Sequence, residues 1–194
     1  MSKNADLAIA PEIAPTEPEI KTVIVLPSGG VAAELPLSGR DYWEFLQLAS
    51  KGADSASQWL LLNAFTLDGQ PLTIDQLEDG LDFEDVLILN AEVTKLFSPD
   101  VEAGESITLA DGRSVNRRKL LGRKFFEFQR RASEKSGVLG ATRWVMTQMF
   151  EIDGEPLTEA QLLESPPEGL GFRAIAQLNQ ILNALFTAAP ALKK

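Results

Sequence analysis

Three stretches of the chain hold side chains that could do chemistry. Acidic residues crowd 75–86 (DQLEDGLDFEDV), two glycines open 169–174 (GLGFRA), and basic residues fill 113–131 (RSVNRRKLLGRKFFEFQRR). Carboxylates can bind metal ions or transfer protons, glycines before a helix can hold phosphate, and arginines among aromatic rings can hold nucleic acid. The sequence must therefore be tested against each of these chemistries.

The first two stretches lack parts that their chemistry requires. The acidic stretch does not have the ligand spacing of a calcium-binding EF-hand. The glycine pair follows ESPPE, whereas a dinucleotide-binding motif follows a β-strand. We interpret the acidic stretch as a solvated face, and we predict no cofactor-binding residue and no metal ligand.

Two residue types that many catalytic sites use, histidine and cysteine, are missing from the sequence. Ser-His-Asp catalysis, thiolate chemistry and ordinary zinc sites are thereby excluded. A Walker loop, a Gly-x-Ser-x-Gly motif and a Ser-x-x-Lys pair are also absent. We predict no catalytic residue and a protein that is not an enzyme.

A thirteen-residue motif occurs twice in the chain. FTLDGQPLTIDQL at 65–77 returns as FEIDGEPLTEAQL at 150–162, with eight identical positions. Matches continue on both sides, where 35–50 aligns with 118–133 and 81–97 aligns with 170–186. A period this long indicates two tandem copies of a small domain rather than a solenoid.

The repeat sets the expected organisation of the chain. Two homologous helical units, related by a pseudo-twofold axis, should occupy 21–98 and 106–188, with a linker at 99–105. Residues 1–20, rich in alanine, proline and glutamate, should form a disordered tail, and 189–194 a short C-terminal tail. The sequence has no apolar run long enough for a membrane span, so we expect a cytoplasmic protein.

The two units differ in charge. Residues 20–98 hold four basic and twelve acidic side chains, whereas 99–194 hold thirteen and twelve. Such different surfaces suggest that the units face different neighbours, or each other.

Each unit is expected to be mainly α with a small β-hairpin, which is an α+β fold. Glycine turns predict the hairpins, at 22–37 and 106–115. Three main helices should follow in each unit, at 40–51, 55–65 and 82–97 in the first and at 123–135, 140–150 and 171–186 in the second.

The repeated motif is expected to separate two helices. Its Asp-Gly pair should end the second helix of the unit, with glycine in the left-handed C-terminal position. The Thr-x-x-Gln spacing that follows predicts a capping box, in which each side chain binds a free backbone N–H at a helix start.

The candidate partner-binding residues lie on helices and in the basic stretch. Each closing helix has an apolar stripe interrupted by one asparagine, which can specify pairing when it is buried. The aromatic residues of 113–131 align with those of the first helix, as core positions would. The candidates are Tyr42, Trp43, Asn90, Arg117, Arg118, Phe125, Phe126 and Asn179.

With this order of elements, each unit resembles the tail assembly chaperones of long-tailed bacteriophages and prophages. The resemblance rests on Asp-Gly-x-Pro-Leu-Thr and its flanking helices, and it covers 22–98 and 106–188. It implies a non-enzymatic protein of the host cell cytoplasm that binds the tape measure protein and helps to recruit tail tube subunits. Family members commonly contain one such domain, so the duplication departs from the usual pattern.

Other functions stay open at this point. Tandem units could instead form a structural component of a phage tail or tail-like particle. Arginine and aromatic side chains of 113–131 could serve a nucleic-acid-binding regulator, although pairing with an acidic protein surface is the interpretation we favour. An oligomer is possible, and neither nucleic acid nor a membrane is an expected partner.

Overall fold

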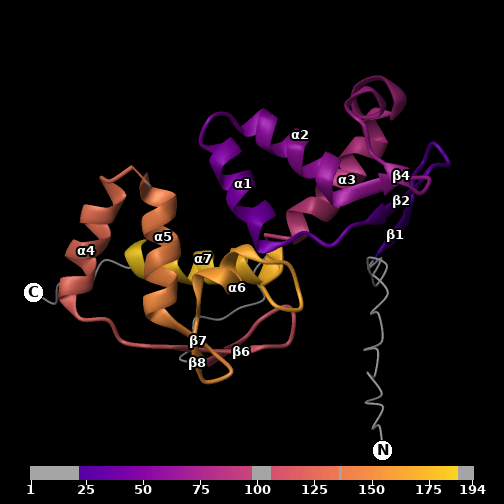
Figure 1. Cartoon of the computed structure of the whole chain (residues 1–194). Helices are drawn as coiled ribbons and strands as arrows, with labels where there is room; N and C mark the ends of the chain where they lie inside the picture. The colour runs from indigo at the N-terminus through magenta and orange to yellow at the C-terminus, as the bar shows by residue number, and fades with distance from the viewer. Residues whose placement is uncertain (1–21, 98–105, 136, 188–194) are drawn as a thin grey trace, which may run out of the picture.

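The computed structural model describes residues 22–97, 106–135 and 137–187. Its two halves, one on each side of 98–105, are mainly helical, and each contains a small four-stranded antiparallel sheet (Figure 1). The predicted mainly α, α+β fold class is therefore confirmed. The predicted tails at 1–20 and 189–194 and the linker at 99–105 lie outside the described residues.

Both halves contain the same order of elements. The first half consists of β1 (Val23–Val25), β2 (Val31–Glu34), α1 (Gly39–Ala49), α2 (Ala53–Ala64), β3 (Phe65–Leu67), β4 (Gln70–Pro71), the π-helix η1 (Gln76–Gly80) and α3 (Phe83–Lys95). The second half consists of β5 (Ser106–Thr108), β6 (Ser114–Arg117), α4 (Gly122–Ala132), α5 (Gly137–Met149), β7 (Phe150–Ile152), β8 (Glu155–Pro156), α6 (Glu159–Leu163) and α7 (Phe172–Thr187). A pseudo-twofold duplication stays a prediction.

The hairpins expected from the glycine turns are present. β1 pairs with β2 and β5 pairs with β6, both antiparallel. Gly29 and Gly112 lie in their turns with φ of 94° and 85°, values that side chains with a β-carbon rarely adopt. In each sheet the second strand of the hairpin also pairs with the strand that opens the repeated motif.

The Asp-Gly pair of the motif forms a hairpin turn, so the prediction that it ends a helix was wrong. Helix α2 ends at Ala64, and Asp68 and Gly69, with φ of 50° and 77°, connect β3 to β4. The Asp68 carboxylate accepts a hydrogen bond from the Val31 amide at 2.9 Å. Residues 65–67 leave the helix because they pair with β2, a contact distant in sequence.

The predicted capping boxes are confirmed in both copies. The Gln76 amide donates to the Thr73 hydroxyl at 3.3 Å, and the Thr73 amide donates to the Gln76 side chain at 3.0 Å. Thr158 and Gln161 repeat this exchange at 3.2 and 2.9 Å. Each box starts a short helical turn before the closing helix of its half.

The core runs through both halves. Phe65 and Phe150, which open the two copies of the motif, are 1% and 0% exposed.

Within the described residues, no helix is both long and apolar enough to cross a membrane.

Candidate protein-binding surfaces

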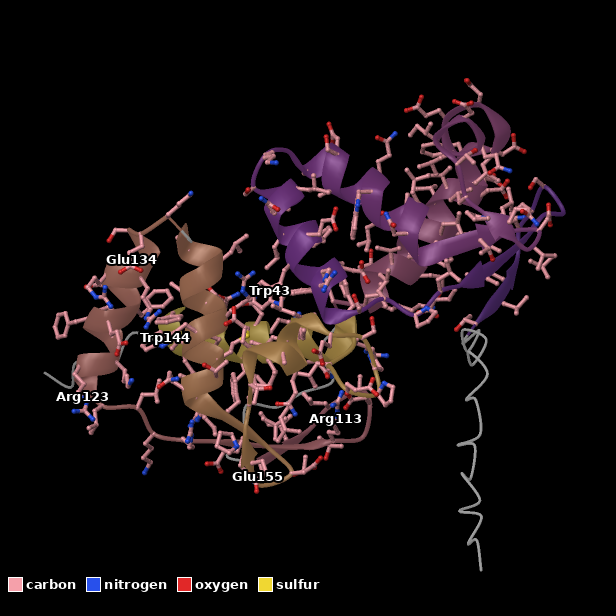
Figure 2. All side chains as sticks on the ribbon, in the orientation of Figure 1. Trp43, Arg113, Arg123, Glu134, Trp144 and Glu155 are labelled. Atoms are coloured by element: carbon pink, nitrogen blue, oxygen red, sulfur yellow. The ribbon has the colours of Figure 1, made fainter. Side chains whose placement is uncertain are left out.

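Helix α1 joins the two halves by packing on α6 and α7 (Figure 1). Its Trp43 lies at the junction of the halves (Figure 2) and donates from Nε1 to the Leu162 carbonyl oxygen at 3.0 Å. Nδ2 of Asn179 on α7 donates to the hydroxyl of Tyr42 at 2.8 Å. Three of the predicted partner-binding residues therefore bind inside the chain, because they hold one half on the other.

Phe172, at the start of α7, lies at the centre of this contact. Its ring centroid is 5.1 Å from that of Tyr42, 6.0 Å from that of Phe45 and 5.4 Å from that of Phe97. Its amide donates to the Leu37 carbonyl oxygen at 3.0 Å. An aromatic side chain of the second half thus fills a site whose walls belong to the first half.

Close backbone approach is a second feature of the contact. A β-carbon at Gly39 would lie 2.4 Å from Cδ1 of Ile175, 2.6 Å from the Leu162 oxygen and 3.0 Å from the Leu170 oxygen. Only glycine permits α1 to start this close to the second half.

Burial at the contact changes the acidity of Tyr42. The side chain is in the core, and its desolvation raises the pKa to about 12. The hydrogen bond from Asn179 lowers the pKa, since it favours the phenolate, but this is the smaller effect. The phenol is therefore neutral around pH 7.

Helix α4 exposes the aromatic residues that correspond to those of α1. Phe125 and Phe126 are 47% and 69% exposed and meet edge to face, with centroids 5.8 Å apart. Leu121, directly before the helix, is 65% exposed. Basic side chains surround this apolar surface, and Figure 2 shows Arg123 at the outer edge of the helix. We call this region the α4 surface.

A small apolar pocket of about 160 Å³ opens on the α4 surface. Helices α4, α5 and α7 all contribute to it. Its lining residues are Leu120, Leu121, Lys124, Phe125, Phe128, Val145, Met149 and Phe186.

Helix α3 exposes a second apolar surface, of opposite charge, which we call the α3 surface. Phe83 and Leu87 are 78% and 51% exposed, and Asn90 is also exposed. The predicted apolar stripe is thus buried at Val93 but open to solvent at Phe83. Residues 76–95 hold six acidic side chains and one basic side chain.

One acid of this region is buried and has a structural role. Asp85 accepts from the Ser28 amide at 3.3 Å and from the Asp82 amide at 3.2 Å, so it connects α3 to the first hairpin. Hydrogen bonds from Ser28 lower its pKa, and desolvation opposes them. Two further acids of 76–95 also have partners within the chain: Glu78 accepts from the Gln58 side chain at 2.8 Å, and Glu92 pairs with Lys95 at 2.6 Å.

Most of the basic stretch is paired within the chain. Five of its eight basic side chains lie within 4.0 Å of a carboxylate, namely Arg113, Arg118, Lys124, Arg130 and Arg131. Arg118 also donates to the carbonyl oxygens of Thr147 and Gln148 at 3.2 and 2.9 Å. Arg117 is half-buried at the end of β6. Of the two predicted arginines, Arg118 thus has a structural role.

A hollow of about 520 Å³ in the second half lies beside Trp144. The guanidinium carbon of Arg131 is 4.6 Å from the Trp144 ring centroid, and Nζ of Lys124 is 5.1 Å from it. Figure 2 shows Trp144 between α4 and α5. These cation–π contacts tie the two helices together. In the described ranges, no three His, Cys, Asp or Glu side chains gather into a metal site.

Comparison of the chain with protein-family models, curated proteins and solved structures finds no match. Inference about function therefore rests on the two surfaces themselves.

The sequence did not reveal which aromatic residues would be exposed. The aligned pairs Tyr42/Phe125 and Trp43/Phe126 look equivalent, yet the first member of each pair is buried and the second is not. One signal was available in the sequence. Tyr42 and Trp43 carry a hydroxyl and an indole N–H that can form hydrogen bonds at a buried contact, whereas the aligned phenylalanines carry no polar atom. Gly39 was not singled out, although its steric role is the clearest at the junction.

Proposed function

We propose that the protein is a non-enzymatic tail assembly chaperone, which binds the tape measure protein and helps to recruit tail tube subunits. The observation that carries this proposal is the exposure of apolar rings on two helices of opposite charge, at Phe83 and at Phe126. Exposed apolar surface of this kind marks sites where proteins bind other proteins.

Composition supports protein partners in particular. Aromatic and arginine side chains, which the α4 surface combines, are enriched in protein interfaces. An amphipathic client helix could place its apolar face on such a surface and its acidic residues near Arg123. Two binding surfaces in one chain would also raise the avidity for a long client.

Nucleic acid is a weaker candidate for the basic stretch, because five of its eight basic side chains already have carboxylate partners. A structural component of a tail or tail-like particle would be present in finished particles, whereas a chaperone would be absent from them.

The test is co-expression of the tagged chain with its neighbouring genes, followed by purification and mass spectrometry. We expect the native chain to retain a very long helical protein or a tail tube subunit. Phe126→Asp should reduce this recovery, whereas Val25→Asp, which changes a side chain 72% exposed on β1, should not. Recovery of nucleic acid, or the presence of the protein in purified particles, would refute the chaperone role.

A further inference from the structure

The repeat predicts a second contact, equivalent to the one between α1 and α7. The two helices that would form it, α4 and α3, both expose their aromatic residues to solvent. The repeat aligns α4 with α1 and α3 with α7. Phe83 thereby corresponds to Phe172, and the two are 78% and 2% exposed. Phe126 corresponds to Trp43, and these are 69% and 4% exposed. Each chain thus contains both sides of a second contact.

The pocket on the α4 surface reproduces the site that holds Phe172. The rings around Phe172 belong to Tyr42, Phe45 and Phe97. Their counterparts in the repeat are Phe125, Phe128 and Phe186, and all three line the pocket of about 160 Å³. The carbonyl group that binds the Phe172 amide belongs to Leu37, whose counterpart Leu120 also lines the pocket.

Two walls of this pocket are spaced as in the filled site. Phe45 and Phe97 lie with their ring centroids 5.0 Å apart in the filled site. Phe128 and Phe186 lie 5.1 Å apart in the pocket. This spacing of Phe128 and Phe186 already suits a phenylalanine ring between them and the rest of the pocket.

Charge favours contact between the two surfaces. Helix α4 has four basic side chains and one acidic side chain, and three of the four (Lys124, Arg130 and Arg131) pair with Glu127 or Glu134, whereas 76–95 has six acidic and one basic. Lys124 on α4 stands where α1 has Asp41, and Glu84 on α3 stands where α7 has Arg173. Relative to the contact between α1 and α7, the acidic residue has become basic on one side and the basic residue acidic on the other. The α4 and α3 surfaces are therefore still opposite in charge.

The second contact must form between chains. In Figure 1, α4 lies at one end of the molecule, whereas η1, which leads into α3, lies at the opposite end. A contact between two different surfaces is heterologous, so repeated contacts build an open chain of copies, or a ring where the rotation between copies closes.

We propose that copies of this chain associate head to tail, with Phe83 of one copy in the α4 pocket of the next copy. The contact repeats between chains what α1 and α7 do within one chain. Phe125 and Phe126 lack the hydroxyl and indole N–H that Tyr42 and Trp43 use, so the contact between chains is weaker and reversible. The client proposed above would use the same two surfaces, so a client and a neighbouring copy would compete for them; self-association is measured on the pure chain, without a client.

The test uses the pure full-length chain in sedimentation velocity over a range of concentrations. We expect the native chain to form species that grow beyond a dimer, and to dissociate as salt is raised. Phe83→Asp and Phe126→Asp should each weaken association roughly 30-fold or more, as loss of a central aromatic anchor does. Val25→Asp is the matched control and should associate like the native chain.

Mixing the two variants gives the decisive result. Phe83→Asp keeps an intact α4 surface and Phe126→Asp keeps an intact α3 surface, so the mixture should form a 1:1 dimer that grows no further. A native chain that stays monomeric at its highest soluble concentration would overturn the proposal. Association of Phe83→Asp at native strength would also overturn it, because it would indicate that two α4 surfaces pair.

Discussion

Replacing Gly39 by alanine tests whether close approach of α1 holds the two halves together. The new β-carbon would lie 2.4 Å from a flexible Ile175 methyl group, but also 2.6 and 3.0 Å from the oxygens of Leu162 and Leu170. Backbone oxygens cannot rotate away as a side chain can. The helix must therefore shift away from the second half.

The loss of stability in Gly39→Ala depends on whether the two halves separate or α1 shifts slightly. Complete separation would expose Tyr42 and Trp43, and aromatic side chains bury about 150–250 Å² each. At roughly 25 cal/mol per Å², that would cost on the order of 10 kcal/mol, so a strained shift is the cheaper outcome. Overpacking costs about 1–3 kcal/mol, and alanine regains up to about 1 kcal/mol as a better helix former. We expect Gly39→Ala to lower the free energy of unfolding by about 1–2 kcal/mol.

Urea denaturation monitored by tryptophan fluorescence measures this change, because Trp43 lies in the strained contact. Gly80→Ala is the matched control, since a β-carbon there would meet nothing closer than 3.7 Å. The control should be neutral or slightly stabilising. If Gly39→Ala were as stable as the control, steric closeness would not be what limits position 39.

Three further predictions concern single residues. Tyr42 is the only tyrosine of the sequence, and burial raises its pKa from 10.0 to about 12. The folded state therefore favours the neutral phenol. This contribution to stability is present below pH 10 and is lost as the pH rises from 10 to 12. Absorbance titration of tyrosinate should show this high midpoint, and Tyr42→Phe should remove the corresponding decline in unfolding free energy; a midpoint near 10 in the folded chain would contradict the burial. Gly154→Ala places a side chain at φ of 88° and should cost about 1 kcal/mol or more in thermal denaturation; an unchanged melting temperature would mean that the turn relaxes. The pKa of Asp85 is lowered from 3.8, so its stabilisation is present above that pH and lost as the pH falls through the lowered pKa; Asp85→Asn should flatten acid unfolding, and an unaltered acid profile would exclude this role.

Local sequence signals predicted the local structure well. Glycine turns were sufficient for the hairpins, and the Thr-x-x-Gln spacing was sufficient for the capping boxes, because both depend on residues a few positions apart. The Asp-Gly pair misled, since the same residues suit a helix end and a hairpin turn. Pairing of Thr66 with Ala33 decides between them, and no local pattern reveals that pairing.

The candidate surfaces could be predicted only in part. Phe126 was named and is exposed, whereas Trp43 was named and is buried against a residue 119 positions away. Helical periodicity shows that an aromatic face exists, but it does not show which neighbour covers that face. The difference between α1 and α4 arises from the packing of whole halves.

Asp68 and its counterpart Asp153 give the repeated motif a further meaning. Each carboxylate binds the amide of a residue on the neighbouring strand, Val31 or Ser114, at 2.9 or 3.0 Å. A shift of one residue between these strands would break that bond and turn every side chain to the wrong face. The motif thus fixes the strand register in both halves, so the charge of the outer faces can differ between the halves without any change in how their sheets pair.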